Sequence, residues 1–133
     1  MARVPIIRFG DVLVATVQEA LDDREARALQ TELAEQLERT GARGVLLDLS
    51  TVETVDSFLG RRLSEIATSA RLLGAQTVVV GIQPTVAITL VELGLELQGV
   101  RTALTPEKGL ALLGRLLPAP AARRPLAGGR RGR

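Results

Sequence analysis

The chain alternates between two patterns of hydrophobic and polar residues. Short, nearly continuous apolar runs rich in valine, isoleucine and leucine predict strands, and they occupy residues 5–9, 12–17, 44–49, 77–82 and 100–103. Longer segments with an apolar residue every three or four positions predict helices over residues 22–40, 57–73, 84 to 93 or 97, and 106–117. The order is therefore two strands, followed by helices and strands in alternation up to a final helix.

This order predicts an α/β fold with a mixed sheet. Gly10 and Asp11 form a turn signal between the first two strands, which we expect to pair as a hairpin. The later strands each follow a helix, so we expect parallel right-handed crossovers and about four helices packed on the sheet. We expect one domain over residues 1–117. Residues 118–133 consist mainly of proline, alanine, glycine and arginine, which predicts a disordered tail.

Several residues mark the expected ends of the helices. Asp22 and Glu25 have the spacing of a capping box, and Gly41 is a typical helix stop. The second helix is expected to end at Gly74. Its buried face should follow an apolar series with steps of three and four residues, formed by Leu59, Leu63, Ile66, Ala70 and Leu73.

The helix that begins near Pro84 is apolar almost all round. Its only polar positions are Thr85, Thr89 and Glu92. Such a helix is either deeply buried or packed against a partner. In a chain of 133 residues a peripheral helix is hard to bury completely, so we expect self-association.

The composition limits the chemistry that the chain can perform. It has no cysteine and no histidine, which removes thiolate nucleophiles, disulfides, cysteine-based metal sites and the usual general base. A hydrolase would have to use carboxylates or Lys108, the single lysine. We therefore expect no enzymatic activity, no metal and no cofactor.

Charge is distributed unevenly along the chain. Residues 1–117 carry 12 basic and 15 acidic side chains, whereas residues 118–133 carry five arginines and no acid. A mildly acidic folded part argues against nucleic acid as a partner, and the tail arginines lack the apolar companions of a nucleic-acid or membrane tether. No apolar run approaches the roughly 20 residues that span a bilayer, and no signal peptide begins the chain, so we expect a soluble cytoplasmic protein.

Asp56 and Ser57 lie where the loop after the third strand becomes a helix. Both residue types are good helix N-caps, so Ser57 can be a cap or a residue just inside a helix capped by Asp56. Ser57 can also be a phosphate acceptor, because the start of a helix offers free N–H donors and the positive end of its dipole. A phosphate there adds about −1.5 to −2 charges at pH 7 and would act as a surface switch.

Two other features suggest sites that the sequence supports less well. Asp48 and Asp56 flank a strand end, as in a phospho-aspartate receiver, but the acidic pair after the first strand and the lysine after the last are missing. Asp48 is therefore interpreted as a structural carboxylate. The passage from Gly81 to Leu95 lacks the glycine patterns of known phosphate loops, which leaves nucleotide binding weakly supported.

Several stretches together resemble STAS domains, the fold of anti-sigma-factor antagonists. The resemblance covers about residues 4–117 and is closer to the small stressosome scaffold of the RsbS type, because Phe58 and Leu59 replace the Ser-Gly that ordinary antagonists tend to carry after Asp-Ser. The stretches that carry it are Pro5-Ile6-Ile7, Leu21-Asp22-Asp23, residues 40–45, Val55-Asp56-Ser57-Phe58-Leu59, Leu73-Gly74-Ala75, and Gly81-Ile82-Gln83-Pro84 through Leu93-Gly94.

The resemblance implies a function that the composition alone does not. Ser57 would be the phosphoacceptor, and Asp56, Phe58 and Leu59 would flank it and contribute to kinase recognition. The implied partners are a serine kinase of the histidine-kinase-like ATPase class, a sensor-STAS paralogue of the RsbR type and a PP2C-type phosphatase. The chain would form a homo- or hetero-oligomeric shell that sequesters the kinase and releases it after stress. A one-to-one anti-sigma-factor antagonist, or a STAS module that binds a small ligand or nucleotide, remains an alternative.

Overall fold

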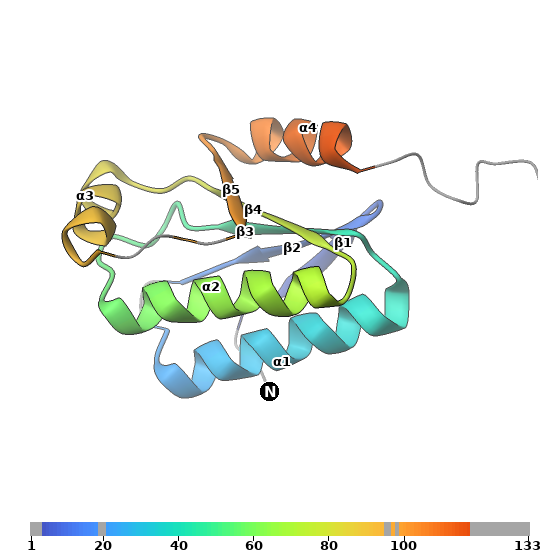
Figure 1. Cartoon of the computed structure of the whole chain (residues 1–133), viewed down its shortest axis with the longest axis horizontal. Coiled ribbons are helices and arrows are strands. Elements are labelled where there is room, and N and C mark those ends of the chain that lie inside the picture. Colours follow the sequence, from blue (N-terminus) through green and yellow to red (C-terminus); the bar gives the residue numbers. More distant parts are fainter. Residues whose placement is uncertain (1–3, 19–20, 95–96, 98, 118–133) are drawn as a thin grey trace, which may run out of the picture.

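The computed structural model describes residues 4–18, 21–94, 97 and 99–117, and within them a sheet of five strands is packed by four helices (Figure 1). The strands are β1 (Ile6–Phe9), β2 (Val12–Thr16), β3 (Gly44–Asp48), β4 (Gln76–Val80) and β5 (Val100–Ala103). The helices are α1 (Asp23–Thr40), α2 (Ser57–Leu72), α3 (Pro84–Glu92) and α4 (Pro106–Leu116).

The sheet is mixed, as the order of elements predicts. β1 and β2 form an antiparallel hairpin in which Phe9 lies opposite Val12. From β2 to β5 each strand is parallel to the next, so the spatial order of the strands equals their order in the chain. The parallel strands therefore all end on the same side of the sheet. The residues at the ends of β2, β3 and β4 are neighbours there, since Val17 bonds to the carbonyl of Asp48 and Leu49 to the carbonyl of Val80.

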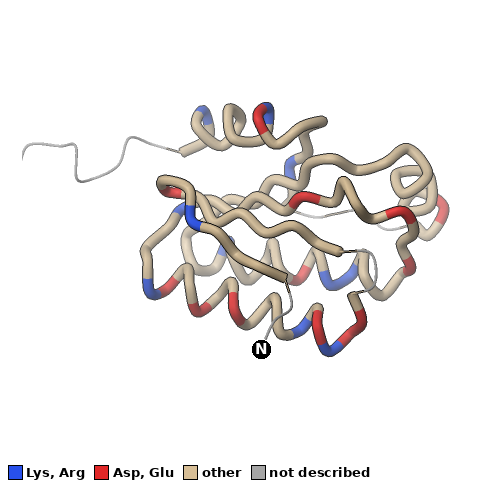
Figure 2. The backbone as a smooth tube through the Cα atoms, turned by 180° about the vertical axis from the view of Figure 1, so that it is seen from behind, with Lys and Arg blue, Asp and Glu red and all other residues tan. Residues whose placement is uncertain are grey.

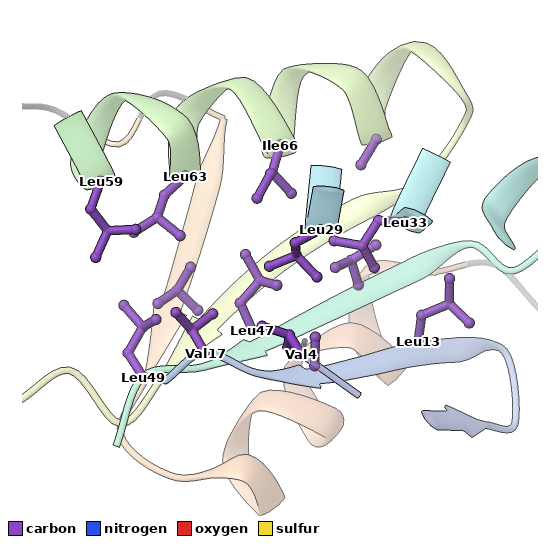
Figure 3. Packing of buried hydrophobic residues seen from close by; sticks show 14 of the residues in the cluster. Val4, Leu13, Val17, Leu29, Leu33, Leu47, Leu49, Leu59, Leu63 and Ile66 are labelled. Carbon is purple, nitrogen blue, oxygen red and sulfur yellow. The ribbon is translucent and has the colours of Figure 1, made fainter. Parts of the chain in front are cut away.

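The helices form layers on both faces of the sheet (Figure 1). α1 and α2 cover one face, α4 covers the other, and α3 lies at the end of the sheet where the parallel strands finish. Neighbouring residues of β3 pack against different helix layers, because successive side chains of a strand point to opposite faces of the sheet. Leu47 packs in the cluster of α1 and α2 (Figure 3), and Leu46 packs in the cluster that contains Leu113 of α4. Both faces of β3 are buried, as its continuous apolar run predicts.

The predicted ends of α1 are confirmed. A carboxylate oxygen of Asp22 accepts the backbone N–H of Glu25 at 2.8 Å, and the Glu25 carboxylate accepts the N–H of Asp22 at 3.1 Å. Gly41 follows the helix with φ +69°, and its N–H donates to the carbonyl of Leu37. The capping box and the left-handed glycine thus satisfy backbone groups that the helix leaves unpaired.

Two sequence predictions need correction. Leu73 does not join the buried face of α2. It caps the end of the helix and the residue is 46% exposed, whereas Ala67 is buried. β4 ends at Val80 and not at Ile82, because Gly81, with φ +75°, turns the chain out of the sheet.

The structure tests the predicted end of α3 but not the predicted tail. α3 ends at Glu92, close to the shorter of its two predicted ends, Leu93. The expected tail over residues 118–133 lies outside the described residues, so the domain boundary at 117 stays a prediction. Among the helices that the structure describes, none is long and apolar enough to cross a membrane.

Candidate functional site

Ser57 is the first residue of α2, and Asp56 is the residue that caps the helix. The backbone of Asp56 is extended, with φ −112° and ψ 174°, and its side-chain oxygen accepts the N–H of Leu59 at 2.8 Å. Because Asp56 performs the capping, the Ser57 hydroxyl is not needed for it. The structure thus selects one of the interpretations open from sequence, a serine just inside a helix capped by aspartate.

The side chain of Ser57 makes no hydrogen bond to the described residues around it. The residue is half-buried, and within the part of the chain that the structure describes its hydroxyl has no hydrogen-bond partner. The backbone N–H groups of Ser57 and Phe58 belong to the first turn and have no acceptor within the helix. A hydroxyl with no structural task therefore lies beside free amide donors.

The loop that leads to Ser57 is held by hydrogen bonds to several strand ends. The Asp48 carboxylate accepts the N–H of Ser50 at 2.9 Å, and the Thr51 hydroxyl donates to the carbonyl of Val17 at 3.0 Å. The Gln83 amide, at the start of α3, donates to the carbonyl of Ser50 at 2.8 Å. Asp48 therefore has the structural role that the sequence predicts. The hydrogen bond from Gln83 connects the start of α3 to this loop, and this connection was not evident from the sequence.

Arg62 joins the starts of α1 and α2 close to the site. Its guanidinium lies 2.8 Å from the Asp23 carboxylate, pairs with Glu65, and stands 5.4 Å from the centre of the Phe58 ring. The Arg62 side chain is only 14% exposed. Sequence reasoning did not single out Arg62. Its position four residues after Phe58 was a usable signal, since residues four apart on a helix are neighbours.

A hollow of about 420 Å³ opens next to Ser57, between the starts of α1 and α2. Carboxylates and apolar side chains both line it: Leu21, Asp22, Asp23, Ala26, Asp56, Phe58 and Leu59. All three residues that were expected to flank the phosphosite are among these lining residues. Leu59 is only 9% exposed and belongs to the core, whereas Phe58 is half-buried and Asp56 is exposed.

Replacing Asp56 by alanine is expected to lower the free energy of unfolding by about 1 kcal/mol, because the N–H of Leu59 loses its acceptor. Urea denaturation followed by circular dichroism measures the change. Asp56→Asn is the matched control, since asparagine caps helices as well as aspartate does and should retain most of the stability. Equal stability of Asp56→Ala and the wild type would contradict the capping role.

A family model described as the STAS domain matches residues 3–107. Among curated proteins, the RsbT co-antagonist protein RsbRD of Bacillus subtilis is 33% identical over 91 residues, which cover 68% of this chain and 33% of that protein. The RsbT co-antagonist protein RsbRA of the same organism is 28% identical over 102 residues, covering 77% of this chain and 37% of that protein. The chain thus spans about a third of the length of these curated relatives.

Solved structures add relatives of similar length. RsbS of Moorella thermoacetica, solved with a serine-to-glutamate substitution, is 42% identical with a TM-score of 0.76, and the match covers 86% of this chain and 97% of that one. A chain from a solved structure of the stressosome, which is described as a signal integration and transduction hub, is 41% identical with a TM-score of 0.74. The match covers 90% of this chain and 100% of that one. The unphosphorylated anti-sigma factor antagonist SpoIIAA, at 12% identity and a TM-score of 0.68, shares the fold, with 86% of this chain and 99% of that one covered.

Proposed function

Because the chain belongs to the STAS domain family, and resembles RsbS and a stressosome chain along most of its length, we propose that it is a non-enzymatic stressosome scaffold. In this proposal it sequesters a serine kinase and releases it when Ser57 is phosphorylated. The observation that carries the proposal is the free hydroxyl of Ser57, presented by a hydrogen-bonded loop at the start of a helix that Asp56 already caps.

Phosphorylation of Ser57 would change the surface and leave the fold intact. The hydrogen bonds that hold the loop involve Asp48, Ser50, Thr51 and Gln83, and none of those described uses the Ser57 side chain. The added dianion would lie beside the carboxylates that line the hollow. A kinase docked over the start of α2 would then meet a larger negative charge and an added group where it previously met a hydroxyl.

The curated matches are named RsbT co-antagonist proteins, which supports a paralogue of the RsbR type as a partner in the assembly. The other partners in this proposal are a serine kinase of the histidine-kinase-like ATPase class and a PP2C-type phosphatase that resets Ser57, as the resemblance implies. Assembly requires free apolar surface, and α3 offers it: Ile88 is 59% and Val91 78% exposed. The sequence of α3 contains one charged residue, Glu92, and Figure 2 draws most of this helix in the colour of uncharged residues.

Incubation of the full chain with its cognate kinase and ATP is expected to place one phosphate on the Ser57 peptide. Mass spectrometry of a digest measures it. The other serines, Ser50, Ser64 and Ser69, serve as internal controls and should stay unmodified. Ser50 is the most stringent of them, because it is exposed in the same loop. An unmodified Ser57 peptide, or phosphate on Ser50 in its place, would refute the proposal.

The size of the assembly separates the scaffold from a one-to-one antagonist. Light scattering of the chain with its paralogue and the kinase should give a very large particle for the scaffold and a small complex for simple partner switching. The similarity to the stressosome chain extends over the whole length of that chain, and it favours the scaffold.

A further inference from the structure

Two consecutive arginines of α2 lie in different surroundings. Arg62 is largely buried, and its guanidinium is occupied by Asp23, Glu65 and the Phe58 ring. Arg61 is exposed, and among the described residues it has no hydrogen-bond or ion-pair partner. Arg62 is therefore committed to the packing of α1 against α2, whereas Arg61 is free to bind another group.

Arg61 follows Ser57 by four residues on the same helix. Residues four apart are neighbours on one helix face, with Cβ atoms about 5–6 Å apart. Arg62 is one residue further round the helix and is turned toward Asp23 of α1. The unpaired guanidinium of Arg61 can therefore approach a group that is attached to the Ser57 side-chain oxygen.

We propose that Arg61 holds the phosphate of phosphorylated Ser57 through charge-assisted hydrogen bonds from its guanidinium. This inference rests on the proposed phosphorylation of Ser57. A guanidinium is planar and presents paired N–H donors that match the oxygens of a phosphate. The pairing would offset the repulsion from Asp56 and from Glu53, which is exposed in the same loop.

The pairing would also change what a partner meets at this surface. Without the phosphate, Arg61 is an exposed cation that a partner's acceptor groups can contact. With it, the guanidinium is drawn to Ser57 and is no longer available. Arg61 is therefore a positioning residue: it fixes the orientation of the phosphate along α2 and couples phosphorylation to the loss of a free positive charge.

The test uses the full chain with phosphoserine incorporated at position 57 during translation, so that no kinase is needed. The titration of the phosphate is followed by ³¹P NMR in the otherwise wild-type chain and in Arg61→Gln, Arg61→Lys and Arg115→Gln. A nearby cation favours the dianion, so its removal in Arg61→Gln is expected to raise the midpoint of the second ionisation by about 0.3 pH unit. Arg61→Lys keeps the positive charge but not the paired donors, so it should restore only part of the difference.

Arg115→Gln is the control, because Arg115 is an exposed arginine of α4, on the opposite face of the sheet (Figure 1). It should leave the midpoint unchanged. An unchanged midpoint in Arg61→Gln, or an equal rise in Arg115→Gln, would overturn the role of Arg61. Because phosphoserine is installed directly, this result is distinct from a failure of the kinase to modify Ser57, which would refute the proposed function instead.

Discussion

Replacing Gly109 by valine is expected to lower the free energy of unfolding by about 2 kcal/mol or more, because α4 lies too close to the sheet for a side chain at this position. A Cβ atom on Gly109 would lie 2.5 Å from a methyl carbon of Val80 and 2.9 Å from one of Leu46. Both neighbours are buried in the centre of the sheet, at 0% and 1% exposure. They cannot move aside without disturbing β3 and β4.

Gly114 provides the matched control within the same helix. A Cβ atom there would meet nothing within 4 Å, so Gly114→Ala should stabilise the chain by up to about 1 kcal/mol through helix propensity alone. Gly109→Ala has the same propensity gain, and the difference between the two alanine variants measures the cost of the close approach. Urea unfolding supplies the free energies. If Gly109→Ala stabilised the chain as much as Gly114→Ala does, the packing argument would be wrong.

The fold could be predicted to a large extent because its elements leave local signals. The capping box of Asp22 and Glu25, the stop at Gly41 and the continuous apolar run of β3 all act over a few residues, and the structure confirms each. The close approach at Gly109 depends on Val80, 29 positions earlier in the chain. No short-range pattern reports such a contact, so the sequence did not reveal it.

In the candidate site, too, the local features could be predicted from the sequence and the contacts between distant residues could not. The sequence located Ser57 at the start of a helix, but aspartate and serine are equally good caps, and only the structure identifies Asp56 as the one that bonds to Leu59. The pairing of Arg62 with Asp23 and the hollow beside Ser57 arise where α1 and α2 meet, and they join residues that are far apart in the chain. The contrast between Arg61 and Arg62 was likewise invisible in a sequence that places them side by side.

Ser57→Ala is expected to keep the fold and to retain the kinase permanently. The Ser57 hydroxyl has no hydrogen-bond partner among the described residues, so its loss should change the free energy of unfolding by less than about 0.5 kcal/mol. Without an acceptor oxygen, ATP can no longer cause release. The measurement is a kinase-release assay, in which immobilised chain is loaded with kinase, treated with ATP and washed.

Ser57→Asp should weaken retention even before ATP is added, because it puts a permanent negative charge on the surface of the start of α2. The loss of affinity should be smaller than that caused by phosphorylation, since aspartate carries one charge where the phosphate carries about −1.5 to −2. Ser50→Ala is the matched control: Ser50 is exposed in the same loop, and the bonds that hold it there use its backbone N–H and carbonyl. It should bind and release the kinase like the wild type. Release of the kinase from Ser57→Ala by ATP would show that the switch lies elsewhere, because this variant has lost only the hydroxyl on which the proposed mechanism depends.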